Sequence, residues 1–344
     1  MIKRTQILTK DKIRPSRQGY EVVGVFNPAA VMAEGETVLL LRVAEKPMDP
    51  DEDTAAFAVY DPERHQLVTR EISRSLKGYD FSDPRIIRAP EQNYLTSISH
   101  IRAARSRDGV SFTVEDAPAL EASSGYEAFG VEDPRVVEMG GIYVVTYCAA
   151  SDKGTVALLA TTKDFHTFEK KSVIFPPDNK DVVLFPQKIQ GNYVALHRPS
   201  TSEYGQPDMW LATSPDMKAW GEHRLLLRAQ DNAWGSARIG AGAPPILTDK
   251  GWLEIYHGAT SDNVYRIGAM LLDREEPWKI LARSREPLLA PSLPFEQTGF
   301  FNDVIFVCGA TETDGLLRLY YGAADCSVGM AELTLDDVWG HLGI

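Results

Sequence analysis

The stretch Glu132-Asp133-Pro134-Arg135, followed by the apolar run 136–138, begins a unit that recurs along the 344-residue chain. Gly140-Gly141 provides a turn directly after that run. Three further segments rich in apolar, β-branched and aromatic residues complete the unit: 142–147, 156–161 and 171–175. Four short strands within about fifty residues predict one blade of a β-propeller.

Two signals repeat in phase with this unit. A proline or an aspartate precedes the first apolar run of each copy: Pro28, Pro84, Pro134, Pro186, Pro245 and Asp303. An aspartate followed four or five residues later by an aromatic residue marks a later turn: Asp108/Phe112, Asp164/Phe168, Asp216/Trp220 and Asp273/Trp278. A repeat of this length built from short strands is typical of a propeller.

The blade count stays open between two alternatives. The prolines suggest six starts, but residues 27–83 lack the aspartate–aromatic signal and would also fit half a blade that carries an inserted hairpin, which gives five. The last copy ends after three strands, so we expect the N-terminal run Thr5–Thr9 to complete it and close the ring, which removes an open sheet edge. We interpret residues 1–344 as a single domain, because no linker or low-complexity tract divides them.

Composition limits the classes of partner. A net charge of −12 argues against nucleic acid and against an anionic membrane surface. The chain has neither an 18-residue apolar segment nor an N-terminal signal-peptide pattern. Cys148, Cys308 and Cys326 lack metal-ligand spacing and read as free thiols. Together these features predict a cytoplasmic protein.

Polar residues occupy positions where the inner strands of a propeller should pack against one another. Blade starts at Asn27-Pro28, Asp83-Pro84, Asp133-Pro134, Pro186-Gln187-Lys188 and Asn302-Asp303 would meet in one funnel. The second strands end in further polar residues: Arg42, His197-Arg198 and Tyr256-His257, with Arg238 in a glycine-rich approach to a blade. Converging charges are costly unless they are paired or functional. Each residue alone also has a structural explanation, such as a turn or an ion pair.

Acids and cations in a funnel suit a sugar substrate and a phosphate. Asp133 is the candidate acid for cleaving a glycosidic bond. Lys188, His197, Arg198 and Arg238 form a cationic set that would hold phosphate, which can attack without a catalytic base. No metal-ligand spacing, dinucleotide glycine pattern or nucleophile elbow occurs in the sequence. We therefore predict no metal and no cofactor, with inorganic phosphate as co-substrate.

These residues resemble glycoside hydrolase family 130, the β-mannoside phosphorylases and related mannosidases, over nearly the whole chain. The motifs on which this resemblance rests include Phe26-Asn27-Pro28, Ser99-His100-Ile101-Arg102, Glu132-Asp133-Pro134-Arg135, Ile174–Pro199, Arg238–Gly242, Tyr256-His257-Gly258 and Gly299–Val304. The segment Ile174–Pro199 is most similar to the branch that acts on β-1,2-linked oligomannosides.

The resemblance implies a five-bladed propeller and inverting phosphorolysis that releases α-mannose 1-phosphate. It implies that Asp133 donates a proton through the 3-hydroxyl of the bound mannose. It also implies that Asn27, Arg42 and Asp303 bind that mannose, and that Lys188 and Arg198 bind phosphate. We add His197 and Arg238 to the phosphate site, and Asp83, Tyr256 and His257 to the substrate site, from their places in the repeat.

Two competing hypotheses remain. An inverting β-1,2-mannosidase on the same scaffold would need a second carboxylate that activates water, and a non-catalytic sugar-binding propeller is compatible with the fold alone. We expect manno-oligosaccharide and phosphate as partners, and an assembly of like chains is compatible with the sequence. Loops at Ser123–Phe129 and Ser202–Asp208 are expected to govern linkage and chain length.

Overall fold

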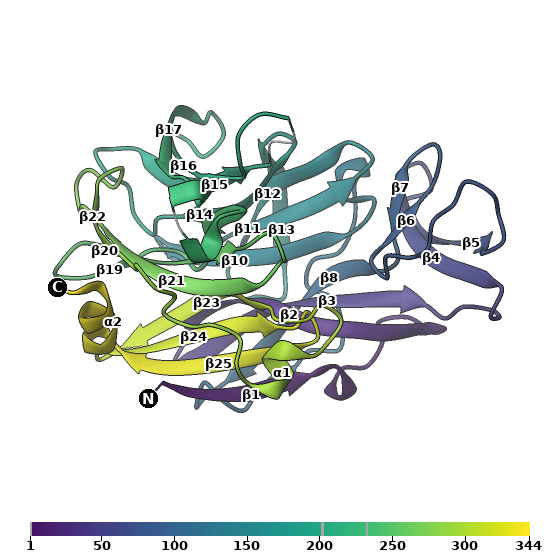
Figure 1. The fold of residues 1–344 in the computed structure, drawn as a ribbon, viewed down its shortest axis with the longest axis horizontal. Coiled ribbons are helices and arrows are strands. Elements are labelled where there is room, and N and C mark those ends of the chain that lie inside the picture. Colours follow the sequence, from purple (N-terminus) through teal and green to yellow (C-terminus); the bar gives the residue numbers. More distant parts are fainter. Residues whose placement is uncertain (1, 201–202, 232) are drawn as a thin grey trace.

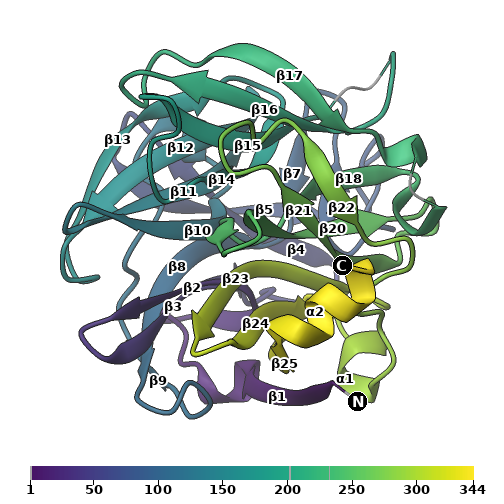
Figure 2. The same cartoon turned by 90° about the vertical axis from the view of Figure 1, so that its left-hand side faces the viewer.

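A computed structural model describes residues 2–200, 203–231 and 233–344. Five larger antiparallel sheets are arranged around a common centre, as the blades of a propeller (Figures 1 and 2). The strands nearest the centre belong to neighbouring blades and contact one another, β2 with β10 and β23, and β14 with β10 and β18. The prediction of a five-bladed β-propeller is confirmed.

The blades follow one another along the chain with the same strand order from centre to rim. The first contains β2 (Tyr20–Ala33), β3 (Glu36–Pro47), β8 (Ile98–Ser106) and β9 (Thr113–Val114). The second contains β10 (Val131–Met139), β11 (Ile142–Ser151), β12 (Gly154–Thr162) and β13 (Phe168–Phe175). The third contains β14 (Asn179–Leu184), β15 (Tyr193–Pro199), β16 (Met209–Ser214) and β17 (Gly221–Leu227).

The last two blades depart slightly from this plan. The fourth contains β18 (Arg238–Ala241), β20 (Trp252–Ala259), β21 (Tyr265–Leu272) and β22 (Ile280–Arg283), with β19 (Ile246–Leu247) also paired to β20. The fifth contains β23 (Ile305–Thr313), β24 (Leu316–Ala323) and β25 (Ser327–Thr334). Two short helices, α1 (Pro294–Gln297) and α2 (Leu335–Leu342), flank this blade. None of the helices among the described residues has the length and hydropathy needed to span a membrane.

The N-terminal strand completes the fifth blade, as predicted. β1 (Lys3–Thr9) pairs antiparallel with β25, and Lys3 lies opposite Glu332. The order β1-β25-β24-β23 gives this blade four strands from two distant parts of the chain. Backbone groups that would otherwise form an open edge are therefore paired.

Residues 48–97 form an insertion between the second and third strands of the first blade. Two hairpins make up this insertion: β4 (Thr54–Asp61) with β5 (Gln66–Ser73), and β6 (Ile86–Arg88) with β7 (Asn93–Leu95). They project at the right-hand end of the molecule in Figure 1, away from α2. Pro84 therefore does not begin a blade. The inserted-hairpin alternative is correct, and the six-bladed alternative is wrong.

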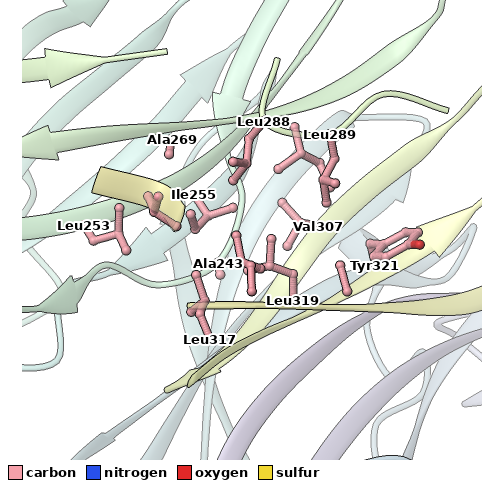
Figure 3. Packing of buried hydrophobic residues seen from close by; sticks show 14 of the residues in the cluster. Ala243, Leu253, Ile255, Ala269, Leu288, Leu289, Val307, Leu317, Leu319 and Tyr321 are labelled. Carbon is pink, nitrogen blue, oxygen red and sulfur yellow. The ribbon is translucent and has the colours of Figure 1, made fainter. Parts of the chain in front are cut away.

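Apolar residues from neighbouring blades hold the ring together. Between the fourth and fifth blades, Leu253 and Ile255 of β20 pack in one buried cluster with Val307 of β23 and Leu317 and Leu319 of β24 (Figure 3). Successive side chains of each strand point to opposite faces of its sheet, so each blade presents apolar side chains to both neighbouring blades. Burial of this surface, at about 25 cal/mol per Å², is the main favourable contribution to ring stability.

The aspartate–aromatic signal corresponds to the turn before each outer strand. In four blades the aspartate accepts hydrogen bonds from backbone N–H groups two and three residues later: Asp108, Asp164, Asp216 and Asp273. An aspartate that bonds its own backbone in this way favours a tight turn. The recurring signal is therefore a structural element of the blade.

Candidate active site

The residues that line the centre of the ring are set by β-bulges in the inner strands. Strand pairing shifts register at Asn27-Pro28 in β2, at Asp133-Pro134 in β10 and at Asp181-Val182 in β14. Asn27, Asp133 and Asp181 have φ values of 48°, 48° and 55°, and Asp303, just before β23, has 57°. Asn and Asp adopt this left-handed conformation more readily than other non-glycine residues. Polar side chains thus recur at matching positions because the fold requires this backbone there.

Asp133 lies at the centre of a dense hydrogen-bond network. Its side chain is 2% exposed. Oδ1 accepts hydrogen bonds from Asn27 Nδ2 at 2.8 Å and from Arg42 Nη1 at 3.0 Å. Lys180 Nζ lies 3.9 Å from Oδ2, and Arg135 Nη1 donates to the Asp133 backbone carbonyl at 2.8 Å. The structure therefore brings together three of the predicted residues, namely the acid and two of its proposed mannose-binding neighbours.

The surroundings of Asp133 favour its ionised form. Burial alone would raise the pKa of Asp133, but the nearby charges of Arg42, Lys180 and Arg135 outweigh it and lower this pKa to about 2. Burial would lower the pKa of Lys180, but the carboxylates of Asp133 and Asp181 raise it. In the unliganded protein, Asp133 is therefore a carboxylate surrounded by cations.

A second buried carboxylate organises the neighbouring cations. Asp181 Oδ2 lies 2.8 Å from Arg198 Nη1 and 3.1 Å from His257 Nε2, and Oδ1 lies 3.5 Å from Arg135 Nη2. Burial would raise the pKa of Asp181, but Arg198, the hydrogen bond with His257 and Arg135 hold it well below its usual range. Burial lowers the pKa of His257 to about 4, which leaves this imidazole neutral near pH 7. Arg198 and His257 are thus brought to the centre, as predicted.

The central cluster combines several cations with several carboxylates. It contains four cations, Arg42, Arg135, Lys180 and Arg198, and three carboxylates, Glu132, Asp133 and Asp181. Lys180 keeps 26% of its side-chain exposure, and Arg198 Nε is buried without a hydrogen-bond partner among the described residues. An anion with several acceptor oxygens would satisfy both groups.

The predicted position of Lys188 is wrong. β14 ends at Leu184, and Lys188 lies in the turn that follows, where its Nζ rests 4.4 Å from the centre of the Tyr193 ring. Because Lys180 is the residue opposite Arg198 in the β14–β15 ladder, Lys188 lies at the far end of this blade. Phe185-Pro186 follows the inner strand and does not precede it. The start of the third blade that was predicted from Pro186 is therefore too late in the sequence.

His197 belongs to a separate layer of the site. It precedes Arg198 in β15, and successive side chains of a strand point to opposite faces. Its ring stacks on Phe175 with centroids 4.4 Å apart, Nδ1 bonds Asn179, and Nε2 lies 3.2 Å from His223 Nδ1. Burial, followed by the charge of His223, lowers the pKa of His197 to about 3. The imidazole of His197 is therefore neutral near pH 7.

Other predicted residues lie outside the central cluster. Arg238 donates to Tyr265 Oη at 2.9 Å and to Asn263 Oδ1 at 2.6 Å. Tyr256 is buried against Trp234 in the core between the third and fourth blades. Asp83 lies in the insertion, where Arg85 donates to both of its carboxylate oxygens at 3.0 Å. The side chain of Tyr256 packs in that core. Arg238 begins β18, the inner strand of the fourth blade, and Asp83 lies in the insertion.

A cavity of about 250 Å³ adjoins Arg42. Its lining includes Phe26, Arg42, Glu132, Arg85, Phe300 and Asp325. Glu132 accepts a hydrogen bond from Arg42 Nη2 at 2.7 Å. Glu132 and Arg135 belong to the motif that first marked the repeat, yet no role was predicted for them. Asp325, Lys180 and Asp181 were also missed, although the last two lie within the segment that carried the family resemblance.

Asp325 makes the stability of the protein depend on pH. Burial, together with Asp133 and Glu132, raises its pKa from 3.8 to about 6 against the opposing effect of Arg42. The folded protein therefore binds more protons than the unfolded chain between these values, and ionisation of Asp325 costs stability as the pH rises through this window.

We expect Asp325→Asn to remove this cost. The substitution should change the unfolding free energy in favour of the folded state, and this change should be larger near pH 7.5 than near pH 4 by about 2 kcal/mol. Asn suits this position because the φ of residue 325 is 49°. Urea unfolding at the two pH values measures the difference, and an equal effect at both would contradict the assigned cause.

No group of three or more His, Cys, Asp or Glu side chains with a geometry suited to a metal ion occurs in the described part of the chain. Cys148, Cys308 and Cys326 are unpaired thiols, the first two buried. Burial raises the pKa of Cys148 to about 11, so this thiol remains protonated and poorly reactive.

Known proteins share both this sequence and this fold. Residues 93–342 match the profile described as β-1,4-mannooligosaccharide phosphorylase in glycoside hydrolase family 130. The β-1,2-mannobiose phosphorylase of Listeria innocua is 42% identical over 342 residues, which are 98% of this chain and 96% of that protein. The 1,2-β-oligomannan phosphorylase of Thermoanaerobacter sp. strain X514 is 42% identical over 252 residues, 72% of this chain and 83% of that protein.

A solved structure gives the same result. The complex of the Listeria innocua β-1,2-mannobiose phosphorylase with β-1,2-mannobiose superimposes with a TM-score of 0.95, and the match covers 99% of both chains. The resemblance inferred from the motifs is thereby confirmed. The identity also extends over the segment that first suggested the β-1,2 branch. With these matches over nearly its full length, the chain belongs to glycoside hydrolase family 130, an enzyme family of β-mannoside phosphorylases.

Proposed function

We propose that the protein phosphorolyses β-1,2-linked mannosides and releases α-mannose 1-phosphate with inversion. The single observation that carries this proposal is the presence of one buried acid, Asp133, beside cations that include Lys180 and Arg198. Phosphorolysis needs both an acid for the leaving oxygen and cations for the attacking phosphate. The phosphorylases of Listeria innocua and Thermoanaerobacter, which are 42% identical, support this substrate class.

In this reaction, a phosphate oxygen forms a bond to the anomeric carbon on the face opposite the glycosidic oxygen. The glycosidic bond breaks, and the leaving oxygen takes a proton that originates on Asp133. In the family mechanism the 3-hydroxyl of the mannose relays this proton. Asn27 and Arg42, which both bond Asp133 Oδ1, would orient the carboxyl for the transfer. One C–O bond forms and one breaks, so the configuration is inverted.

Phosphate binding would prepare Asp133 for this role. The cations that lower its pKa to about 2 leave it ionised in the free enzyme, and an ionised carboxylate cannot donate a proton. A phosphate dianion beside Lys180 and Arg198 would offset their charge, and a bound sugar would exclude water. Both changes favour the protonated acid. We therefore expect binding of phosphate and sugar to be accompanied by proton uptake.

Incubation with β-1,2-mannobiose, with and without inorganic phosphate, tests the proposal. We expect α-mannose 1-phosphate and mannose in equal amounts, only when phosphate is present. Release of two mannose molecules without phosphate would instead identify a mannosidase. That alternative needs a carboxylate to activate water. Asp181 and Glu132 are both paired with cations, so Asp325, which lines the cavity beside Arg42, would be the candidate.

The assignment of Lys180 to phosphate gives a further prediction. Lys180→Met should raise the KM for phosphate about 10- to 100-fold, because it removes a direct cation from the anion site. Lys188→Met is the matched control, since Lys188 lies at the opposite end of the blade, and it should leave the KM unchanged. Steady-state rates at varied phosphate separate the two variants. The reverse pattern would restore the assignment made from sequence.

Inorganic phosphate is the co-substrate in this proposal, with no further cofactor. Three cysteines that form no disulfide fit a reducing compartment, and we propose the cytoplasm as the site of action. Phosphate is available there as co-substrate, and cleavage of the mannoside would release a sugar that carries a phosphate group.

A further inference from the structure

The cavity beside Arg42 continues into a larger groove. The cavity measures about 250 Å³ and the groove about 610 Å³. Val23 and Phe300 line both. Pro84 lines the groove, and the next residue in the sequence, Arg85, lines the cavity. The cavity and the groove are therefore neighbours, so a ligand longer than the cavity would reach the groove.

The insertion in the first blade builds one wall of this groove. Residues of the insertion on that wall include Asp49, Ala56, Arg74, Phe81, Asp83 and Thr96. The facing wall comes from β2 and β3, with Glu21 and Lys46, and from the segment between α1 and β23, with Phe300. The insertion itself packs against the loop 123–129 through Phe129, which shares an apolar cluster with Phe57 and Tyr94. Its position is thus fixed relative to the catalytic centre.

The chemistry of the groove differs from that of the catalytic cluster. Its lining contains three cations, Lys10, Lys46 and Arg74, and three carboxylates, Glu21, Asp49 and Asp83. Two pairs neutralise each other directly, with Arg74 Nη2 2.8 Å from Asp49 Oδ2 and Lys46 Nζ 3.0 Å from Glu21 Oε1. Balanced charge favours an uncharged polar ligand over a phosphate. Phe81 and Phe300 add aromatic surface on which the apolar face of a sugar ring can pack.

A rigid pair marks the junction of cavity and groove. Arg85 bonds both carboxylate oxygens of Asp83 at 3.0 Å, and its guanidinium lies 4.5 Å from the centre of the Phe301 ring. These hydrogen bonds lower the pKa of Asp83 to about 2, so the pair stays charged at neutral pH. Fixed polar groups of this kind bind sugar hydroxyls with little loss of side-chain entropy.

We propose that the groove binds the sugar units on the leaving side of the scissile bond, so that the enzyme prefers mannosides longer than a disaccharide. The inference rests on the proposed function and specifies its substrate. The profile shared by the family begins at residue 93, whereas Arg74, Phe81 and Asp83 precede it. Chain-length preference would then depend on residues of the insertion.

The test compares kcat/KM for phosphorolysis of β-1,2-mannotriose and β-1,2-mannobiose. The unsubstituted enzyme should prefer the trisaccharide, and Phe81→Ala and Arg74→Ala should each lower the trisaccharide-to-disaccharide ratio about fivefold to tenfold. Arg224→Ala is the matched control. Arg224, in β17 of the third blade, pairs with Glu222 and lies over the ring of Trp278. Arg74 is arranged in the same way with Asp49 and Phe81. It should leave the ratio unchanged.

An equal ratio in all four proteins would overturn the groove assignment, while cleavage of mannobiose would still support the proposed function. Calorimetric binding of both sugars to Asp133→Asn gives a second measurement that does not require turnover. Tighter binding of mannotriose, lost on adding Phe81→Ala, would support the groove, and equal binding would refute it. Thermal melting of each variant verifies that it is folded.

Discussion

Asp133→Asn should lower kcat for mannoside phosphorolysis by about 10²–10⁴-fold, the range typical of removing a general acid. The amide cannot deliver the proton that the leaving oxygen requires. It keeps the size of the side chain and can still accept the hydrogen bonds from Asn27 and Arg42 that now reach Oδ1. Substrate affinity should therefore change much less than turnover.

The backbone makes Asn the appropriate replacement. Residue 133 has a φ of 48°, and Asn27 has the same value at the matching bulge of the first blade, so Asn fits this conformation. Asp152→Asn, at an exposed residue paired with Lys153, serves as the control. Initial rates and equilibrium binding of mannobiose give the two readouts. Near-normal turnover in Asp133→Asn would refute its role as the acid, and loss of binding alone would indicate a sugar-binding protein.

Asp181→Ala should destabilise the folded protein by about 3–5 kcal/mol, the cost of leaving buried charges without their partner. Asp181 is fully buried and contacts Arg198, Arg135 and His257. Without the carboxylate, two guanidinium groups face each other across a space closed to solvent. Alanine at a φ of 55° adds backbone strain.

Urea unfolding measures this loss, and two variants separate its causes. Asp181→Asn keeps the backbone preference and hydrogen-bond acceptor but removes the charge, so we expect an intermediate loss. Asp152→Ala breaks an exposed ion pair, which contributes at most about 1 kcal/mol. If Asp181→Ala and Asp152→Ala had similar unfolding free energies, the proposed organising role of Asp181 would be untenable.

Much of the fold could be predicted because its determinants are local. Runs of apolar, β-branched and aromatic residues in 142–147 and 156–161 indicated strands that the structure contains as β11 and β12. The aspartate that begins a turn, as at Asp164, recurs because it bonds its own backbone. The motif around Asp133 carried both the acid and its bulge, so the centre of the ring was recognisable from sequence.

The third blade shows where such reasoning fails. Its bulge lies at Asp181-Val182 and contains no proline, so the nearby Pro186 was taken as the marker. Val182 stands where the first two blades have Pro28 and Pro134, so Pro186 lies four residues too late. Lys188 was therefore predicted in the phosphate site, where we now propose Lys180. A left-handed φ at an aspartate leaves no unambiguous sequence signal, because aspartate also occurs in ordinary turns and ion pairs.

Long-range packing explains the remaining omissions. Asp325 faces the cavity only because the fifth blade comes to lie beside the first. The groove depends on the position of the insertion against distant segments, including Phe300. The loop 123–129 was expected to govern linkage and chain length, and its packing against the insertion through Phe129 could not be read from the sequence. Of the second expected loop, Ser202 falls outside the described residues.

The pairing of β1 with β25 has a consequence for biosynthesis. Lys3 leaves the ribosome more than 300 residues before its partner Glu332, so β1 has no partner during most of translation. Its exposed strand edge must avoid pairing with other nascent chains until the C-terminal hairpin emerges. Closure of the ring is therefore a late event, and contacts so distant in sequence form slowly.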